Sequence, residues 1–159
     1  MRNIKIYSLI EKPEYTEICA AWLYGHWLCH REGETLKKSI EYYQEQNTDI
    51  KKVILTWIAI AEGKIAGTAT LDYADHEDHK DLTPWLANVY VHPHFRGQNI
   101  ASSLIKHIKE EAKKMGYPHI YLFTPDAMEL YKNLGWKFIK NIRDPSGMHE
   151  AEKLMKTEL

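Results

Sequence analysis

Apolar residues recur at every third or fourth position between residues 100 and 115, which is typical of a helix with one packed face. The residues of this face are Ile100, Leu104, Ile105, Ile108, Ala112 and Met115. Gly116 follows the last of them, and Pro118 comes soon after, where a helix cannot continue. The pattern therefore predicts an amphipathic helix that ends before Gly116.

The first half of the chain shows helical patterns near its start and strand patterns after them. The expected elements are a strand over 4–10, helices over 13–26 and 36–46, and strands over 53–60, 65–73 and 85–91. Glu62-Gly63 is a hairpin signal between the second and third strands. The chain lacks internal repeats, low-complexity segments and linkers, so a single domain over residues 1–159 is expected.

Residues 120–139 are predicted to form a strand, a short helix and another strand. Thr124 is expected to cap the helix, and Pro125 is expected at its first position. Proline suits this position because an N–H group there would have no partner within the helix. Gly135 is expected to end the helix before a strand that begins at Trp136.

Composition narrows the class of protein. The 159 residues are 44% hydrophobic and 27% charged, which is ordinary for a soluble globular domain. The net charge of -1 argues against a nucleic-acid partner. Cys19 and Cys29 lie ten residues apart in one helical segment, too far to pair. With neither a signal segment nor a long apolar run, we expect a cytoplasmic protein without membrane contact.

The stretch from Val89 to Ala101 leads from a strand straight into the amphipathic helix. The free N–H groups of a first helical turn and the helix dipole attract anions. Gly97 lets the backbone approach a ligand closely, and Arg96 adds a permanent positive charge. The stretch lacks both the Gly-Lys-Ser/Thr ending of a P-loop and the three-glycine dinucleotide fingerprint. A phosphate-bearing ligand of another class is therefore predicted.

Two elements in this order resemble the GCN5-related N-acetyltransferase (GNAT) family. Residues 96–101, Arg-Gly-Gln-Asn-Ile-Ala, resemble its acetyl-CoA signature, with Asn99 in the usual glycine position. Asparagine tolerates left-handed backbone and can cap a helix, so the turn can be kept. The second element matches at Ala127, Tyr131, Gly135 and Trp136, with Thr124 in place of the usual asparagine.

The resemblance implies an α/β (α+β) fold. Its central mixed, mostly antiparallel twisted sheet would have about six or seven strands, flanked by about four helices. It also implies acetyl-CoA as cosubstrate, a small-molecule or peptide amine as acceptor, and a possible homodimer. An aminoglycoside, a polyamine, an amino acid and a protein N-terminus all stay open as acceptors. The expected cofactor-binding residues are Val89, Tyr90, Val91, Arg96, Gly97, Gln98, Asn99, Ile100, Ala101, Ser102 and Thr124.

Acetyl transfer needs a base, because a primary amine is protonated at neutral pH, and an acid for the leaving thiolate. The resemblance assigns the acid role to Tyr131; the alternative is a tyrosine that only packs and orients the cofactor. Residues 85–91 contain no carboxylate, so the base is sought elsewhere. Asp72 is the first candidate, followed by the polar loop 75–81.

Trp27 and Asn88 are predicted to contact the acceptor, although Trp27 also suits a core position. The loop 75–81 contains His76 and His79 between carboxylates, but the spacing is not that of a metal site. A solvated acidic loop that attracts a cationic acceptor is expected instead. Two other functions stay open: CoA binding without turnover, and transfer of another acyl group or to an oxygen acceptor.

Overall fold

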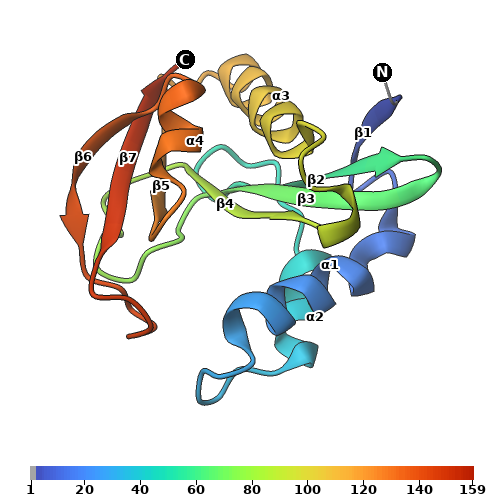
Figure 1. Ribbon diagram of the computed structural model, residues 1–159, viewed down its shortest axis with the longest axis horizontal. Coiled ribbons are helices and arrows are strands. Elements are labelled where there is room, and N and C mark those ends of the chain that lie inside the picture. The colour runs from blue at the N-terminus through green and yellow to red at the C-terminus, as the bar shows by residue number, and fades with distance from the viewer. Residues whose placement is uncertain (1–2) are drawn as a thin grey trace.

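The computed structural model describes residues 3–159, which form a seven-stranded mixed sheet with four α-helices (Figure 1). The strand order is β1-β2-β3-β4-β5-β7-β6, and every neighbouring pair is antiparallel except β4 and β5. The strands are β1 Ile4–Ser8, β2 Ile54–Ala61, β3 Lys64–Asp72, β4 Trp85–Val91, β5 His119–Thr124, β6 Lys137–Ile142 and β7 Glu152–Glu158. The predicted fold class is confirmed.

The helices lie on both faces of the sheet. The α-helices are α1 Thr16–Leu23, α2 Leu36–Gln44, α3 Ile100–Lys114 and α4 Met128–Asn133. Short 3-10 helices, η1 Pro13–Tyr15 and η3 Pro93–Phe95, and a π-helix, η2 Tyr24–Leu28, complete the set. Figure 1 shows α3 above β2, β3 and β4 and the α1–α2 pair below them.

The amphipathic pattern of α3 is confirmed. Ile100, Leu104, Ile105 and Ile108 are buried in the main core against β2, β3, β4 and β5. A second core packs Cys19, Ala20, Leu23 and Tyr43 of α1 and α2 under Ile58 of β2. The two cores fix α3 on one face and α1–α2 on the other, so the start of α3 is held at the end of β4.

Three expectations need adjustment, and one strand was missed. The helix over 36–46 ends at Gln44, because Glu45 leaves helical backbone geometry. Pro125 does not occupy the first position of α4: the helix begins at Met128 with Ala127 as its N-cap. Thr124 stabilises the preceding turn instead, since its Oγ1 accepts a hydrogen bond from the Ala127 N–H at 3.1 Å. The C-terminal strand β7 has no counterpart among the elements located from the sequence. It lies between β5 and β6.

The sheet opens between β4 and β5, whose register contains a single Cα pair, Trp85 with Tyr121, within residues 3–159. A bulge in β4 accompanies this opening: Thr70 pairs with Ala87 but Thr68 with Tyr90. Asn88 and Val89 thus lie opposite the single residue Ala69, and the φ of Asn88, 54°, is left-handed. Bulges increase strand twist and redirect side chains. The sheet therefore divides into a β1–β4 part and a β5–β7–β6 part.

Gly67 in β3 allows this packing. A Cβ at this position would lie 2.7 Å from the Tyr90 carbonyl oxygen and 3.2 Å from Ile100 Cγ2.

Both Cys19 and Cys29 are free thiols, as expected. Among the described residues, no helix is long and apolar enough to cross a membrane.

Candidate active site

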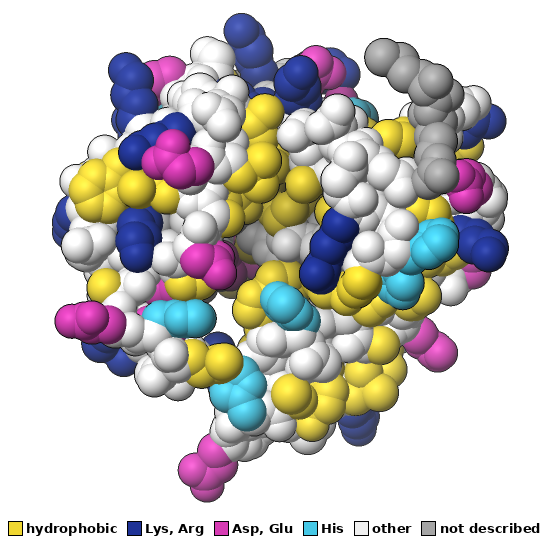
Figure 2. All heavy atoms as spheres, viewed as in Figure 1, with side chains coloured by type: hydrophobic (Ala, Val, Ile, Leu, Met, Phe, Trp, Pro, Cys, Tyr) yellow, Lys and Arg dark blue, Asp and Glu magenta, His cyan; other side chains and the backbone are white. Residues whose placement is uncertain are grey.

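A cavity of about 620 Å³ lies where β4 and β5 diverge. Figure 2, drawn in the same view as Figure 1, shows a hollow near the centre of the visible face, with hydrophobic and acidic side chains at its edge. Its walls come from β4, β5, α4, η2, the loop after β3 and the segment between β6 and β7. The predicted site residues on these walls are Trp27, Asn88, Val89, Thr124 and Tyr131.

The predicted anion-binding turn precedes α3. Gly97 and Asn99 both have left-handed backbone, with φ of 75° and 60°. The expectation that asparagine adopts this geometry is confirmed, but the Asn99 side chain makes no capping hydrogen bond. No side chain at the N-cap therefore occupies the N–H groups of the first turn of α3. This 15-residue helix also contributes the positive end of its dipole.

Arg96 lies across the end of β4. Its Nε donates a hydrogen bond to the Val91 carbonyl at 3.0 Å, and its guanidinium carbon lies 5.9 Å from the centre of the Tyr90 ring. The residue is exposed. These contacts hold the stem of the side chain while the other guanidinium N–H groups stay accessible, an arrangement suited to an anionic ligand.

Aromatic residues of the first helical region cover Tyr90. The rings of Trp22 and His26 lie 5.0 Å and 5.4 Å from the Tyr90 ring. Trp27 is half-buried, packing on the second core while also lining the cavity. The π-helical turn η2 presents His26 and Trp27 side by side, with ring centres 4.5 Å apart. Trp27 therefore belongs to the second core and also lines the cavity, while its contact with the acceptor stays a prediction.

Asp72 lies behind the cavity wall rather than in it. It is buried, and its Oδ2 accepts a hydrogen bond from Tyr42 Oη at 2.6 Å. Asn88 Nδ2 in turn donates to Tyr42 Oη at 3.2 Å. Burial raises the pKa of Asp72. The chain Asp72–Tyr42–Asn88 thus anchors the bulge of β4, and Asp72 lines a separate, smaller pocket of about 230 Å³.

Tyr131 faces the cavity from α4. The residue is 8% exposed, and its ring packs against Trp136 with centres 6.0 Å apart. Burial, with a contribution from the charge of Asp126, raises the pKa of Tyr131 to about 12. The phenol therefore keeps its proton at physiological pH and can act only as a hydrogen-bond or proton donor toward an anion.

Two carboxyl groups in the cavity have unusual pKa values. Burial raises the pKa of Asp75 to about 7, and the charges of Asp72 and Glu152 add to the effect. Burial likewise raises the pKa of Glu152 to about 7, with a further contribution from Asp144. Asp75 belongs to the loop 75–81 considered from the sequence, but Glu152 was missed. The sequence signal that could have identified Glu152 is its spacing of two residues from Leu154, since alternate residues of a strand face the same side and both are buried in β7.

Asp144, also missed, behaves differently although it lines the same cavity. Burial opposes its ionisation, but hydrogen bonds from the Ser146 hydroxyl and N–H and from the His149 N–H outweigh burial and lower its pKa. The three donors lie 2.6–2.8 Å from its oxygens. Asp144 is therefore a charged and fully hydrogen-bonded carboxylate, in contrast to Glu152.

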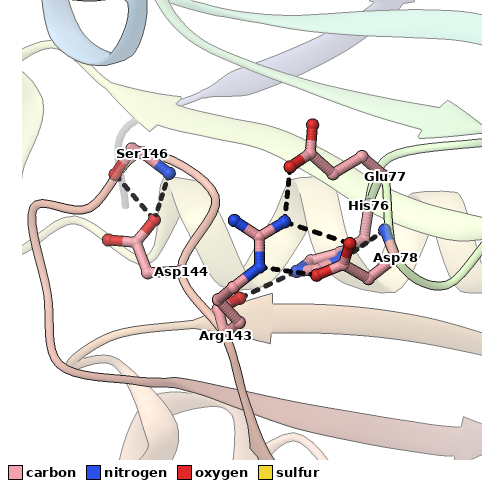
Figure 3. A network of polar contacts seen from close by, with 6 residues as sticks. All are labelled: His76, Glu77, Asp78, Arg143, Asp144 and Ser146. Carbon is pink, nitrogen blue, oxygen red and sulfur yellow. Dashed lines mark hydrogen bonds and ion pairs between the residues drawn. The ribbon is translucent and has the colours of Figure 1, made fainter.

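The loop after β3 is fastened to the end of β6, as Figure 3 shows. Arg143 contacts Glu77 at 2.5 Å and Asp78 at 2.8 and 3.0 Å. The Asp78 N–H donates to His76 Nδ1, so His76 Nε2 carries the proton that it donates to the Arg143 carbonyl at 3.0 Å. His76 is 3% exposed. The acids Glu77 and Asp78 are exposed, as expected for a solvated loop, but both pair with Arg143, and His76 of the same loop is buried.

The described residues contain no group of three or more His, Cys, Asp or Glu side chains that could hold a metal ion. The residues around the α3 turn, from Tyr90 to Ser102, lie outside the cavity lining, while Val89 and Thr124 belong to it. The predicted anion-binding turn and the cavity thus lie next to each other along β4.

Comparisons with known proteins agree with this geometry. Residues 19–136 match the model of the acetyltransferase (GNAT) family. The chain is 32% identical over 85 residues to N-acetyltransferase 8B of Homo sapiens, covering 51% of the chain and 37% of that protein. It is 34% identical over 83 residues to thialysine N-epsilon-acetyltransferase of Bos taurus, covering 50% of the chain and 47% of that protein. These matches span less than half the length of either relative.

A solved structure extends the comparison to the whole fold. Aminoglycoside 6'-N-acetyltransferase complexed with coenzyme A superposes with a TM-score of 0.75 at 15% identity, covering 97% of this chain and 96% of that one. At this identity the likeness concerns the fold. Together with the family match over most of the sequence, it leads to one conclusion: the chain belongs to the GNAT acetyltransferase family.

Proposed function

We propose that the protein transfers an acetyl group from acetyl-CoA to a primary amine, by direct attack of the amine while both substrates are bound. One observation carries the proposal: a donor-rich helix start and a cavity with a proton donor and a neutral-range carboxyl group are joined along β4. The coenzyme A complex of the structural neighbour supports the choice of cofactor.

The cofactor diphosphate would bind at the start of α3. Arg96 and the backbone N–H groups from Gly97 to Ser102 would hold it, since they offer a permanent charge and unpaired donors. The left-handed residues Gly97 and Asn99 support this role because they turn the chain before the helix. Tyr90, Gln98, Ile100 and Ala101 would form the surrounding contacts.

The thioester would lie in the opening between β4 and β5. Beyond the pair of Trp85 with Tyr121, the edge of β4 that faces β5 has no paired strand, so backbone groups around Val89 and Val91 are available to it. Such N–H groups stabilise the oxyanion that forms when the amine attacks. Thr124, at the end of β5, would border the same opening.

The base in this proposal is Asp75 rather than Asp72. Asp75 lines the cavity, and its pKa of about 7 suits a group that must accept a proton near neutral pH. Asp72 already accepts a hydrogen bond from Tyr42, and we assign it the positioning of Asn88. Asn88 and Trp27 would contact the acceptor from the cavity wall.

The steps balance as follows. Asp75 removes a proton from the ammonium group, and the amine nitrogen forms a bond to the thioester carbon. The carbon–sulfur bond then breaks, and its electron pair leaves on the sulfur of CoA. Tyr131 donates a proton to that thiolate, and solvent restores the phenol. The products are an acetylated amine and CoA with a free thiol.

The test combines acetyl-CoA binding by calorimetry with thiol release in the presence of a panel of amines. Arg96→Ala is expected to weaken acetyl-CoA binding about tenfold or more, the range for loss of a charged hydrogen bond. Lys106→Ala, on the exposed side of α3, is the matched control. Binding without thiol release for every amine would favour a CoA-binding module. A preference for longer acyl chains would favour another acyltransferase.

A further inference from the structure

The side chain of Glu152 has a carboxyl oxygen without a hydrogen-bond partner in the cavity. The residue is 6% exposed, it lines the cavity, and its Oε2 has no hydrogen-bond partner. A buried carboxylate without a partner is strongly unfavourable in its charged form. The protein therefore holds, beside the proposed acceptor site, a buried carboxyl oxygen that is available to a hydrogen-bond donor of a bound molecule.

The charged groups near Glu152 do not supply that partner. Asp144 and Asp126 are acidic and disfavour its ionisation. The basic neighbours are His149 and Lys153, and the Lys153 ammonium donates to the Pro125 carbonyl at 2.9 Å. The surroundings of Glu152 therefore combine an excess of acid with an unused hydrogen-bond acceptor.

Asp75 also lines the cavity, and its carboxyl group is close enough for the charge of Glu152 to affect it. The charge of Glu152 disfavours ionisation of Asp75, and the charges of Asp144 and Asp126 disfavour ionisation of Glu152. A molecule with two positive charges would stabilise both carboxylates. A monoamine would satisfy only one of them. An acceptor with its own carboxylate would meet repulsion from Glu152, Asp144 and Asp126.

We propose that the acceptor is a diamine, one nitrogen of which is deprotonated and acetylated beside Asp75 while the second, as an ammonium group, binds the carboxylate of Glu152. This inference rests on the proposed function and names the substrate class of the same site. Glu152 is then a specificity residue: it binds the half of the acceptor that does not react. Arg31 lines the cavity on the η2 side and is not among the charges that shift the pKa of Glu152.

The experiment compares three acceptors of equal chain length: the five-carbon diamine cadaverine, pentylamine and the matching amino alcohol. Wild-type kcat/KM for cadaverine is expected to exceed that for pentylamine about tenfold or more, as for a hydrogen-bonded ion pair in a partly buried site. Glu152→Gln is expected to remove this preference by raising the KM for cadaverine. The measured quantity is the ratio of kcat/KM for cadaverine to kcat/KM for pentylamine in each variant, because a change in the pKa of Asp75 affects both acceptors alike.

Two further variants keep the test decisive. Glu150→Gln removes an exposed neighbouring carboxylate outside the cavity and is expected to keep the preference. Glu152→Asp keeps the charge but shortens the reach, and serves if the amide variant does not fold. It is expected to retain part of the preference.

The outcomes separate this inference from the proposed function. Acetylation of cadaverine and pentylamine with equal kcat/KM, in wild type and in Glu152→Gln alike, would overturn the diamine inference and leave the acetyltransferase assignment standing. If no thiol is released with any of the three amines or with any other amine of the panel, the proposed function itself is overturned.

Discussion

Asp75, which follows β3, and Glu152, the first residue of β7, line one cavity, and the charge of Glu152 adds to the burial that raises the pKa of Asp75 to about 7. Burial and the charge of Asp144 raise the pKa of Glu152 to about 7 as well. Two acids with related pKa values but different neighbours can serve two purposes. In the proposed mechanism, Asp75 accepts a proton from the reacting nitrogen, and Glu152 binds the second charge of the acceptor.

Asp75→Asn is expected to lower kcat about a hundredfold, the lower range for loss of general acid–base catalysis. Because the base acts in its deprotonated form, wild-type kcat/KM should rise with pH and level off above about 7. The variant should lose this rise. Asp81→Asn, an exposed acid of the same loop, is the control, and an unchanged pH profile in Asp75→Asn would remove the base assignment.

Tyr131→Phe is expected to lower turnover about a hundredfold or more while the affinity for acetyl-CoA stays within about threefold. The hydroxyl is the only atom group removed, so ring packing against Trp136 is retained. Single-turnover kinetics and calorimetry measure the two quantities separately. A turnover loss below about threefold would instead mean that Tyr131 only orients the cofactor.

Glu152→Gln is expected to raise the melting temperature at pH 8 and to leave it nearly unchanged at pH 4. The pKa of Glu152 rises from 4.5 in its ordinary state to about 7 in the folded protein. Between these values the folded state binds more protons than the unfolded state, so wild-type stability falls as pH rises through this window. The neutral amide does not titrate. Thermal melts at both pH values, without substrate, measure the difference, and an equal shift at both would contradict it.

Arg143→Ala is expected to raise the acceptor KM about threefold to tenfold, because the loop that carries Asp75 loses its contacts with the segment after β6. The melting temperature should change little, since exposed ion pairs contribute at most about 1 kcal/mol. Hydrogen exchange at His76 and Asp78 should increase. Arg143→Lys, which cannot bind both acids in the same planar geometry, should behave similarly. An unchanged KM together with faster exchange would mean that the contacts of Arg143 with the loop have only a structural role.

Asn99→Gly is expected to keep acetyl-CoA affinity within about threefold, and Asn99→Ala to lower stability by about 1 kcal/mol, the approximate cost of left-handed backbone for a residue with an ordinary side chain. The φ of 60° is the reason: glycine adopts it freely and alanine does not. Denaturant melts and calorimetry test the pair. Equal stability of the two variants would contradict the backbone argument.

Features with a local cause could be predicted from the sequence. The stripe of α3 and the left-handed turn at Asn99 follow from side-chain spacing and backbone preference, so both appear as expected. The start of α4 was misplaced because Thr124 caps a turn rather than the helix itself. Proline suits either position, so the local pattern could not distinguish them.

The part of the cavity that is proposed to bind the acceptor could not be predicted in the same way. The contacts of Arg143 with Glu77 and Asp78 join segments on opposite sides of the sheet opening, and no local pattern encodes them. Glu152 appears in sequence as one of several acids among lysines near the C-terminus. Only the placement of β7 between β5 and β6 turns it inward.

Gly67 has no functional group and lies under the start of α3, where the space for one additional carbon is already taken by the Tyr90 carbonyl and Ile100. The spacing between β3 and the first turn of that helix is therefore set by a missing side chain. A single methyl group there would displace the turn that precedes α3 relative to β4, and so change the distance between the proposed diphosphate and thioester positions. In the proposed complex, Gly67 would thus match the length of the cofactor to the position of the reaction without contacting either.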